Sequence, residues 1–263
     1  MMSPFIAEFI GTAILLLLGA GVAANVTLKK TLAEGQTPWL LISTAWGFAV
    51  FAGAYVTGQF SGAHLNPAVT LGLALIGKFS WSLVPTYALG QLFGAMFGSW
   101  LSYILYIDHY RATSDEDAVR GTFCTGPAIR NYKNNLFSEF LGTFILVFGI
   151  FFIVSPNIEV IGMKTQSFGI GSLEALPVGI LVWVIGMSLG GTTGYAINPA
   201  RDLGPRLVYS MLPRKNKNSD WSYAWVPILG PLAGGLVAGI LYNFLFGLNF
   251  SIIWLRLRLL FIE

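Results

Sequence analysis

The sequence is poor in charge, in cysteine and in histidine. Only 10% of its 263 residues are charged, whereas a soluble domain has about 25%. One cysteine and two histidines provide no disulfide framework and no cluster of metal ligands, so we expect no cofactor and no metal. No nucleophile with a neighbouring base stands out, which disfavours an enzyme. The net charge of +3 is scattered over loops and does not favour a nucleic-acid partner.

Long apolar runs make up most of the chain. Apolar residues account for 55% of it, and several runs exceed the roughly 18 residues that suffice for a membrane-spanning helix. They lack the alternation of about ten residues that is typical of a barrel, which predicts an all-α membrane protein. The first four expected spans lie near residues 4–24, 38–60, 80–106 and 136–154. No basic residue precedes the first run, which favours a retained span over a signal peptide.

One phrase of ten residues occurs twice. Residues 61–70 read SGAHLNPAVT, and residues 193–202 read TGYAINPARD. Proline suits the first position of a helix and asparagine suits the cap before it. Each phrase therefore predicts a helix start, at 67–77 and at 199–210. At about 1.5 Å per residue such a helix crosses only about half of a bilayer core of roughly 30 Å.

A second motif indicates a tandem duplication. EFIGT at residues 8–12 recurs as EFLGT at residues 139–143, an offset of 131, and the asparagines of the two phrases are 132 residues apart. Each half then has three spans and one half-helix. An odd number of spans inverts the second half, which predicts six transmembrane helices and two half-helices in a 3+3 inverted repeat.

The domain boundaries follow from this duplication. We predict a first repeat at 1–107, a charged connecting loop at 108–135 and a second repeat at 136–248. Residues 249–263 form an apolar tail that contains two arginines. This tail is either an interfacial helix or a segment added to the natural protein.

Inversion would bring the N-termini of the half-helices together near the middle of the membrane. Irregular backbone at that depth must be buried in protein or line a wet cavity, so the residues before each asparagine are expected to line a pore. Small residues four positions apart would let helices close in around it, although ordinary packing explains most of them. They are Gly90, Gly94, Gly98, Gly186, Gly190 and Gly194.

The paired Asn-Pro-Ala boxes, the doubled Glu-Phe-x-Gly-Thr and the inverted layout resemble the aquaporin family. The boxes consist of Asn66, Pro67, Ala68, Asn198, Pro199 and Ala200. Within that family the chain is similar to the glycerol facilitators, or aquaglyceroporins, in SGAHLNPAVT, in Trp225-Val226-Pro227 and above all in Asp202 after Arg201. The resemblance spans residues 4–247. It implies a multi-pass protein of the cell membrane, a homotetramer with one pore per subunit, and cytoplasmic termini.

The distribution of basic residues conflicts with that orientation. With cytoplasmic termini, four of the 15 basic residues would lie inside, namely Lys78, Lys164, Arg256 and Arg258. The positive-inside rule favours the reverse. We follow the resemblance, because Arg201 and Arg206 belong to a half-helix and not to a free loop.

The resemblance implies a selectivity filter near the outer mouth. Matched by spacing to the boxes, its residues are Trp46, Gly186, Tyr195 and Arg201. The best-known glycerol facilitators have phenylalanine where Tyr195 stands, and its hydroxyl could narrow the filter or add a hydrogen bond. A charge at membrane depth costs from about 2.5 to over 10 kcal/mol, so Arg201 should face a watery cavity, where its donors bind hydroxyl oxygens and its charge repels cations. Trp46 and Tyr195 could also be plain core or interface aromatics.

Further pore contacts are expected around the boxes. Asn66 and Asn198 can cap their helices and donate into the pore, where two helix N-termini add positive potential. The expected acceptors on the opposite wall are the backbone carbonyls of Gly62, Ala63, His64, Gly194, Tyr195 and Ala196. His64 is expected in that wall and not at a metal site, because the other histidine, His109, lies in a loop.

Two carboxylates lie within apolar runs. Such residues are often functional, for example in proton relays. For Glu8 and Glu139 we favour a structural role, in which each accepts hydrogen bonds from the irregular stretch before its half-helix and holds that backbone in place.

These features predict a passive channel for small uncharged solutes that excludes ions and protons. Glycerol is the first expected solute and water also passes; urea, dihydroxyacetone and lactic acid are further candidates, and membrane lipid surrounds the protein. A water-selective channel and a channel for small neutral acids such as lactic acid remain alternatives, and Gly186 argues against the first, because water-selective relatives usually have histidine there. An ion-coupled secondary transporter would share inverted repeats, but it usually needs ion-coupling side chains at the midplane, where this chain has two neutral asparagines.

Overall fold

The computed structural model describes residues 2–35, 39–153, 157–158, 166–167 and 171–246, and this part of the chain is almost entirely helical. The longer helices are α1 (Pro4–Thr27), α2 (Trp39–Ser61), α4 (Val84–Leu105), α7 (Tyr132–Ile150), α8 (Leu176–Leu189) and α11 (Val226–Leu245). The shorter ones are α3 (Pro67–Leu75), α5 (Ile107–Ala112), α6 (Glu116–Gly121), α9 (Pro199–Met211) and α10 (Trp221–Ala224). Two 3₁₀ turns, Trp81–Leu83 and Gly171–Ala175, precede α4 and α8.

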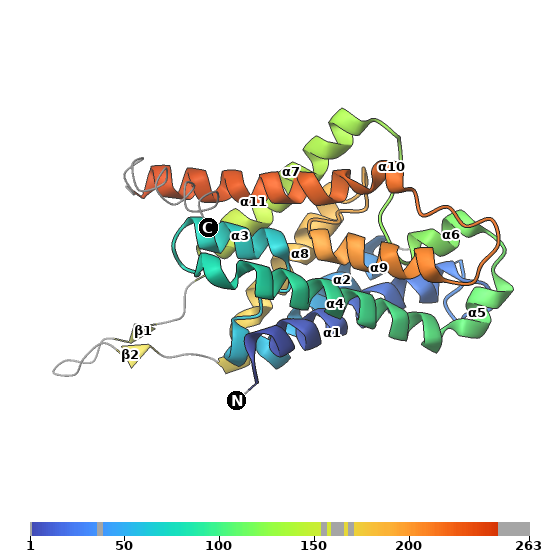
Figure 1. Ribbon diagram of the computed structural model, residues 1–263, viewed down its shortest axis with the longest axis horizontal. Coiled ribbons are helices and arrows are strands. Elements are labelled where there is room, and N and C mark those ends of the chain that lie inside the picture. The colour runs from blue at the N-terminus through green and yellow to red at the C-terminus, as the bar shows by residue number, and fades with distance from the viewer. Residues whose placement is uncertain (1, 36–38, 154–156, 159–165, 168–170, 247–263) are drawn as a thin grey trace.

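A pair of two-residue antiparallel strands projects from one end of the helices (Figure 1). These strands are β1 (Asn157–Ile158) and β2 (Gln166–Ser167), with Asn157 opposite Ser167. The tail predicted at 249–263 lies outside the described residues.

Proline and short polar residues set the starts of the helices. Proline occupies the first turn of α1, α3, α4, α8, α9 and α11, where its missing amide hydrogen costs nothing. Ser3 caps α1, and its hydroxyl accepts a hydrogen bond from the amide of Ile6. The helix starts therefore follow from local chemistry that is readable in the sequence.

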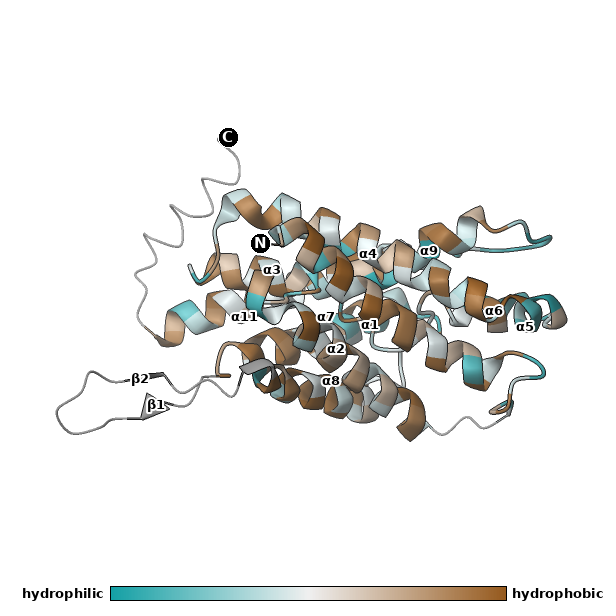
Figure 2. Ribbon diagram, turned by 90° about the horizontal axis from the view of Figure 1, so that it is seen from below, coloured by the Kyte–Doolittle hydropathy of each residue, from teal (hydrophilic) through white to brown (hydrophobic). Residues whose placement is uncertain are grey.

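Four helices in the described part are long and apolar enough to cross a membrane. They are Pro4–Thr27, Trp39–Ser61, Trp81–Leu105 and Trp221–Leu245. A shorter apolar helix spans Leu173–Leu189. Figure 2 shows that hydrophobic residues dominate the long helices, whereas hydrophilic residues gather at the end that carries α5 and α6. The expectation of a helical membrane protein is confirmed by these apolar helices of membrane-spanning length.

The long helices pack in corresponding pairs. α1 packs mainly against α4, and α7 packs mainly against α11. Glycine makes the first contact close: a β-carbon at Gly90 would lie 2.8 Å from the carbonyl oxygen of Phe5, and β-carbons at Gly94 and Gly98 would collide with the backbone of α1. These three glycines thus let α4 pack directly on α1.

The helices α3 and α9 lie toward opposite ends of the molecule (Figure 1). α3 lies toward the end from which the strands project, and α9 lies toward the end with α5 and α6. α3 packs on α11 and α9 packs on α4. Contacts between α3 and α9 bring the two helix starts together inside the bundle.

The stretch 108–135, expected to be a connecting loop, contains more structure than the sequence suggested. It carries α5 and α6 and the first turn of α7, which begins at Tyr132. A buried cluster of Tyr110, Val119 and Phe123 packs this stretch on Tyr209 of α9. Because its charged residues mask these few apolar contacts, composition alone predicted a loop.

Candidate functional site

An elongated cavity of about 750 Å³ runs between the helices. Its lining residues come from α2, α3, α7, α8 and both repeated phrases. On α2 the lining runs from Trp46 to Gln59, a distance of about 20 Å at the helical rise of 1.5 Å per residue. Apolar side chains such as Val50 and Leu146 line much of it, whereas Arg201 and Glu174 add charge.

The two asparagines meet inside this cavity. Asn66 caps α3 through a bond from the Ala68 amide to its side-chain oxygen (2.9 Å), and Asn198 caps α9 through a bond from the Ala200 amide (3.0 Å). Each side-chain nitrogen also donates across to the other phrase. Asn66 donates to the Ile197 carbonyl and Asn198 to the Leu65 carbonyl, both at 2.8 Å.

Among the described residues, this exchange uses one hydrogen of each side-chain amide and leaves the other without a partner. A side-chain amide carries two N–H donors, and one is used in the crossing bond. Both asparagines line the cavity, so the second donor is available to a molecule inside it. The crossing bonds also tie the two phrases to one another, which sequence reasoning did not predict because the acceptors are backbone carbonyls, which no residue type marks.

The backbone before each asparagine is wound into an unusual conformation. Positive φ angles occur at Gly62, Ala63, Leu65, Gly194, Tyr195 and Ile197. For residues other than glycine this conformation costs about 1–2 kcal/mol each. Of the six expected carbonyl residues, five are among the residues that line the cavity, whereas Gly194 is not among the described lining residues.

Glu8 lies directly behind the first of these stretches. Its carboxylate accepts bonds from the amides of His64 (3.0 Å) and Leu65 (2.8 Å) and from the hydroxyl of Ser61 (2.7 Å). Gln91 of α4 donates to the same carboxylate (2.7 Å) and to Thr70 (3.0 Å). The carboxylate therefore takes the amide hydrogens that would otherwise compete for the carbonyls of this stretch.

Glu139 repeats this arrangement in the second half. It accepts bonds from the amides of Ala196 (3.0 Å) and Ile197 (2.8 Å) and from the hydroxyl of Thr193 (2.6 Å). The side chain is 1% exposed. Such bonds to a charged acceptor are worth about 1.5–3 kcal/mol each, which offsets the strained backbone they hold.

Arg201 and Trp46 face one another in the cavity wall. The Arg201 guanidinium carbon lies 4.0 Å from the centre of the Trp46 ring, a close cation–π contact. One guanidinium nitrogen donates to the Phe123 carbonyl at 3.3 Å. Asp202, the next residue in the sequence, does not pair with Arg201 but with Arg206, at 2.8 Å.

Gly186 and Tyr195 form one unit at the wall. A β-carbon on Gly186 would lie 2.7 Å from Cζ of Tyr195, so the absence of a side chain makes room for the ring. Gly190 borders the same ring, and Trp39 packs edge-on against it at 5.8 Å and donates to the Gly186 carbonyl. Gly186 itself is not among the described residues that line the cavity.

The hydroxyl of Tyr195 lies beside Gly186 and Ser43 of α2, neither of which is among the described residues that line the cavity. It is buried and has no hydrogen-bond partner of acceptable geometry among the described residues. The ring therefore presents an apolar surface to the cavity.

His64 lines the cavity and is held among aromatic rings. Its Nδ1 lies 3.1 Å from the Thr70 hydroxyl, and its ring packs against Phe79 and Tyr87 at 4.7 and 4.8 Å.

The described residues contain no group of three or more His, Cys, Asp or Glu side chains that could hold a metal ion. Burial raises the pKa of the lone thiol, Cys124, to about 12, so it is a poor nucleophile at neutral pH.

Comparisons with known proteins found relatives that match most of this chain. The family model described as major intrinsic protein matches residues 1–242. A probable glycerol uptake facilitator protein of Thermotoga maritima is 51% identical over 93% of this chain and 100% of its own length. A glycerol uptake facilitator protein of Bacillus subtilis is 46% identical over 92% of this chain and 84% of its own.

Two further matches extend the range of relatives. A D/L-lactic acid transporter of Lactiplantibacillus plantarum is 38% identical over 95% of this chain and its own entire length. The X-ray structure of the aquaglyceroporin from Plasmodium falciparum is 33% identical, with a TM-score of 0.76 over 95% of this chain and 98% of that one.

Proposed function

The chain belongs to the major intrinsic protein family, and we propose that it conducts glycerol passively through the cavity that Arg201 and Trp46 line. It is a channel protein and not an enzyme, and the glycerol uptake facilitators among its relatives support glycerol as the solute. Water passes by the same route. The observation that carries this proposal is the 4.0 Å contact of Arg201 with Trp46 beside an otherwise largely apolar cavity wall.

The proposed architecture has six crossings and two half-helices in inverted repeats. α1, α2 and α4 form the first repeat, within residues 1–107, and α7, α8 and α11 form the second, proposed at 136–248, with α7 beginning four residues earlier at Tyr132. The matching pairs α1–α4 and α7–α11 and the opposed positions of α3 and α9 support it. α7 and α8 are the less obvious crossings, because neither is among the four helices that are long and apolar enough to cross a membrane, and α8 spans only 14 residues.

The proposed filter suits a molecule with one apolar and one polar side. The rings of Trp46 and Tyr195 meet the carbon backbone of glycerol, while Arg201 donates to its hydroxyl oxygens. The carbonyls of the two phrases accept from the hydroxyl hydrogens further along. The wall replaces the lost hydration without binding so strongly that the solute is held.

Ion exclusion is assigned to the centre and the filter together. The N-termini of α3 and α9 each carry about half a positive charge, and Asn66 and Asn198 add donors at the same place. A cation there loses its hydration and gains no acceptor. A water molecule that accepts from both asparagines cannot pass a proton along a chain.

Replacing the filter arginine tests this assignment. Arg201→Val should raise proton and potassium leakage through proteoliposomes, because the guanidinium charge that repels cations is lost. Arg111→Val is the matched control, since Arg111 lies at the surface, where it pairs with exposed Asp108. Leakage equal to that of the control and wild type would remove Arg201 from this role.

Small neutral acids form the second candidate class. The D/L-lactic acid transporter among the relatives supports it. Stopped-flow measurements on proteoliposomes should rank glycerol, water and lactic acid in one preparation. Glycerol flux no faster than through empty liposomes would overturn the proposal, and saturable uptake coupled to an ion gradient would indicate a transporter instead.

The proposed setting is the cell membrane, with both termini cytoplasmic and four copies per assembly. Exposed large apolar side chains on the outward faces of α2 and α4, such as Phe48, Phe93 and Trp100, suit contact with lipid or a neighbouring subunit.

A further inference from the structure

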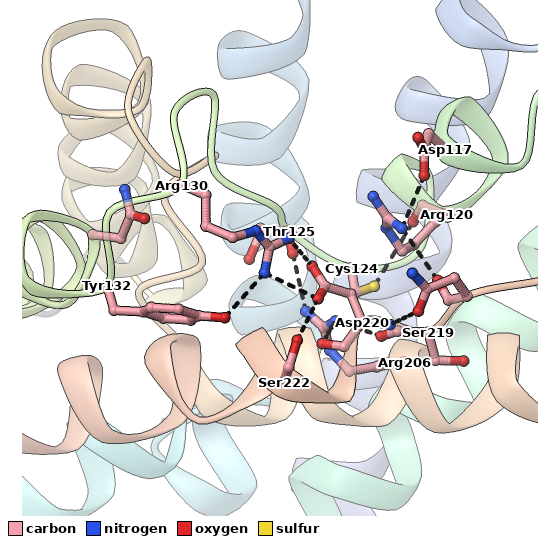
Figure 3. A network of polar contacts seen from close by, with 12 residues as sticks. Asp117, Arg120, Cys124, Thr125, Arg130, Tyr132, Arg206, Ser219, Asp220 and Ser222 are labelled. Atoms are coloured by element: carbon pink, nitrogen blue, oxygen red, sulfur yellow. Dashed lines mark hydrogen bonds and ion pairs between the residues drawn. The ribbon is translucent and has the colours of Figure 1, made fainter.

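The segment between α6 and α7 is fastened to α9 by buried charge. Asp202 and Arg206 of α9 form an ion pair in which both side chains are fully buried. Figure 3 shows Arg206 between the segment that contains Thr125 and the segment that contains Ser219 and Asp220. Arg206 donates to the carbonyls of Thr125 (2.9 Å) and Ser219 (2.7 Å). A buried pair of this kind is costly to break because the remaining charge has no partner.

Thr125 is held at three of its atoms. Its amide and its hydroxyl both donate to the same oxygen of Asp202, at 2.8 and 2.7 Å, and its carbonyl accepts from Arg206. Its side-chain methyl group lies against Gly194, where a β-carbon would come within 3.3 Å. Thr125 therefore contacts the residue after Arg201 and the residue before Tyr195.

The same segment supplies the hydrogen-bond acceptor for Arg201. Phe123, two residues before Thr125, offers its carbonyl to the Arg201 guanidinium at 3.3 Å. The Phe123 ring is 1% exposed and packs on Tyr209 of α9 at 5.6 Å. Phe123 is thus anchored by its ring on one side and by Thr125 on the other, so its carbonyl points at Arg201 in one orientation.

We propose that Thr125 is a positioning residue of the filter, which fixes the Arg201 guanidinium through the Phe123 carbonyl and thereby sets the largest polyol that passes. The inference rests on the proposed function, because it requires that Arg201 faces the solute. In this proposal the Asp202 carboxylate does not bind Arg201 directly. It binds Thr125 and so holds the segment that orients Arg201.

The outer end of the network supports this reading. Asp220 receives two bonds from Arg130, and Ser222 donates to it at 3.0 Å. Arg130 lies five residues after Thr125, and the pairing with Asp220 raises its pKa further above its usual value. The segment is therefore tied down on both sides of Thr125, and the hydroxyl of Thr125 is the tie that acts next to the filter.

The test compares solute selectivity in matched variants. Thr125→Val removes the hydroxyl bond to Asp202 and keeps the shape of the side chain. Thr125→Ser keeps the hydroxyl and therefore the bond. Thr122→Val is the control: Thr122 is also buried in this segment, and its hydroxyl bonds to Tyr110 and to the Val119 carbonyl, not to α9. The readout is the ratio of erythritol to glycerol permeability in proteoliposomes, with water permeability measured in the same preparation.

We expect Thr125→Val to raise this ratio at least about threefold, because a loosened guanidinium admits the longer polyol. Thr125→Ser and Thr122→Val should keep the wild-type ratio. An unchanged ratio in a Thr125→Val protein that conducts glycerol overturns the inference alone, whereas a wild-type protein that does not conduct glycerol overturns the proposed function as well. If Thr125→Val fails to fold, Thr125→Ala replaces it with the same expected ratio, and failure of both variants would make Thr125 purely structural and overturn the inference.

Discussion

Gly186→Ala should lower glycerol permeability more than water permeability, while the packing of the other helices is unchanged. A β-carbon at this position would lie 2.7 Å from Cζ of Tyr195 and 2.9 Å from its hydroxyl oxygen. Unstrained contacts between carbon atoms are about 3.5–4.0 Å, so the ring must move by about 1 Å. Gly190 and Trp39 border the ring away from the cavity, which leaves the cavity as the direction in which it can yield.

The magnitude follows from the cost of overpacking. Forcing an extra methyl group into a packed site costs about 1–3 kcal/mol. If glycerol must push the displaced ring back to pass, its permeability falls by about 5- to 150-fold, since 1.36 kcal/mol is a factor of ten. Water is smaller and does not need the full opening, so its permeability falls less and the ratio of glycerol to water permeability drops.

Stopped-flow light scattering on proteoliposomes measures both permeabilities in one preparation. Gly191→Ala is the matched control, because a β-carbon there meets no atom within 4 Å. A glycerol-to-water ratio equal to that of the control, in protein that incorporates normally, would refute the assignment of Gly186 and Tyr195 to the filter.

Two other substitutions test the supports of the filter. Glu139→Gln should lower the thermal unfolding midpoint in detergent. The side-chain NH₂ of glutamine replaces the oxygen that accepts from the Ala196 or Ile197 amide, and a buried donor left without a partner costs about 1–3 kcal/mol. An unchanged midpoint would contradict the role of the carboxylate in holding this backbone. Tyr195→Phe should keep glycerol permeability within about twofold of wild type, because the hydroxyl lies beside residues that are not among the described cavity lining, and a larger change would mean that the hydroxyl meets the solute.

The parts of the structure that sequence could predict are those that depend on local chemistry. α3 and α9 begin at Pro67 and Pro199, and both asparagines accept from the first-turn amides, as capping preferences require. The all-helical membrane class follows from the length of the apolar runs in the same way. The family was also readable, because two copies of one phrase at matching places are far more specific than either copy alone.

The parts that sequence could not predict are contacts between distant segments. The acceptor of Arg201 is a backbone carbonyl, at Phe123, and every residue has such a carbonyl, so no residue type marks it. The ion pair of Asp202 with Arg206, one helical turn on, was not predicted either. The four-residue spacing could have favoured Arg206, because residues four apart share a helix face.

The glycines show why identical spacing can serve different ends. Gly90 and Gly94 recur every four residues, and so do Gly186 and Gly190, but the first pair lets α4 approach the backbone of α1 whereas the second pair houses the ring of Tyr195. A period of four shows only that the small residues share a face. What fills the space is decided by the element that packs there.

The two phrases also differ in how firmly they are held, and this asymmetry has a consequence. Glu8 receives a fourth donor from Gln91 of α4, whereas the corresponding place on α11 is Pro231, which offers no side-chain donor. The second phrase depends instead on Thr125 and on the buried Asp202–Arg206 pair. Because this support comes from a segment at the end of the bundle that carries α5 and α6, we expect sequence changes there to alter the proposed filter without touching a cavity residue. The first phrase is insulated from such changes by its contacts within the helices.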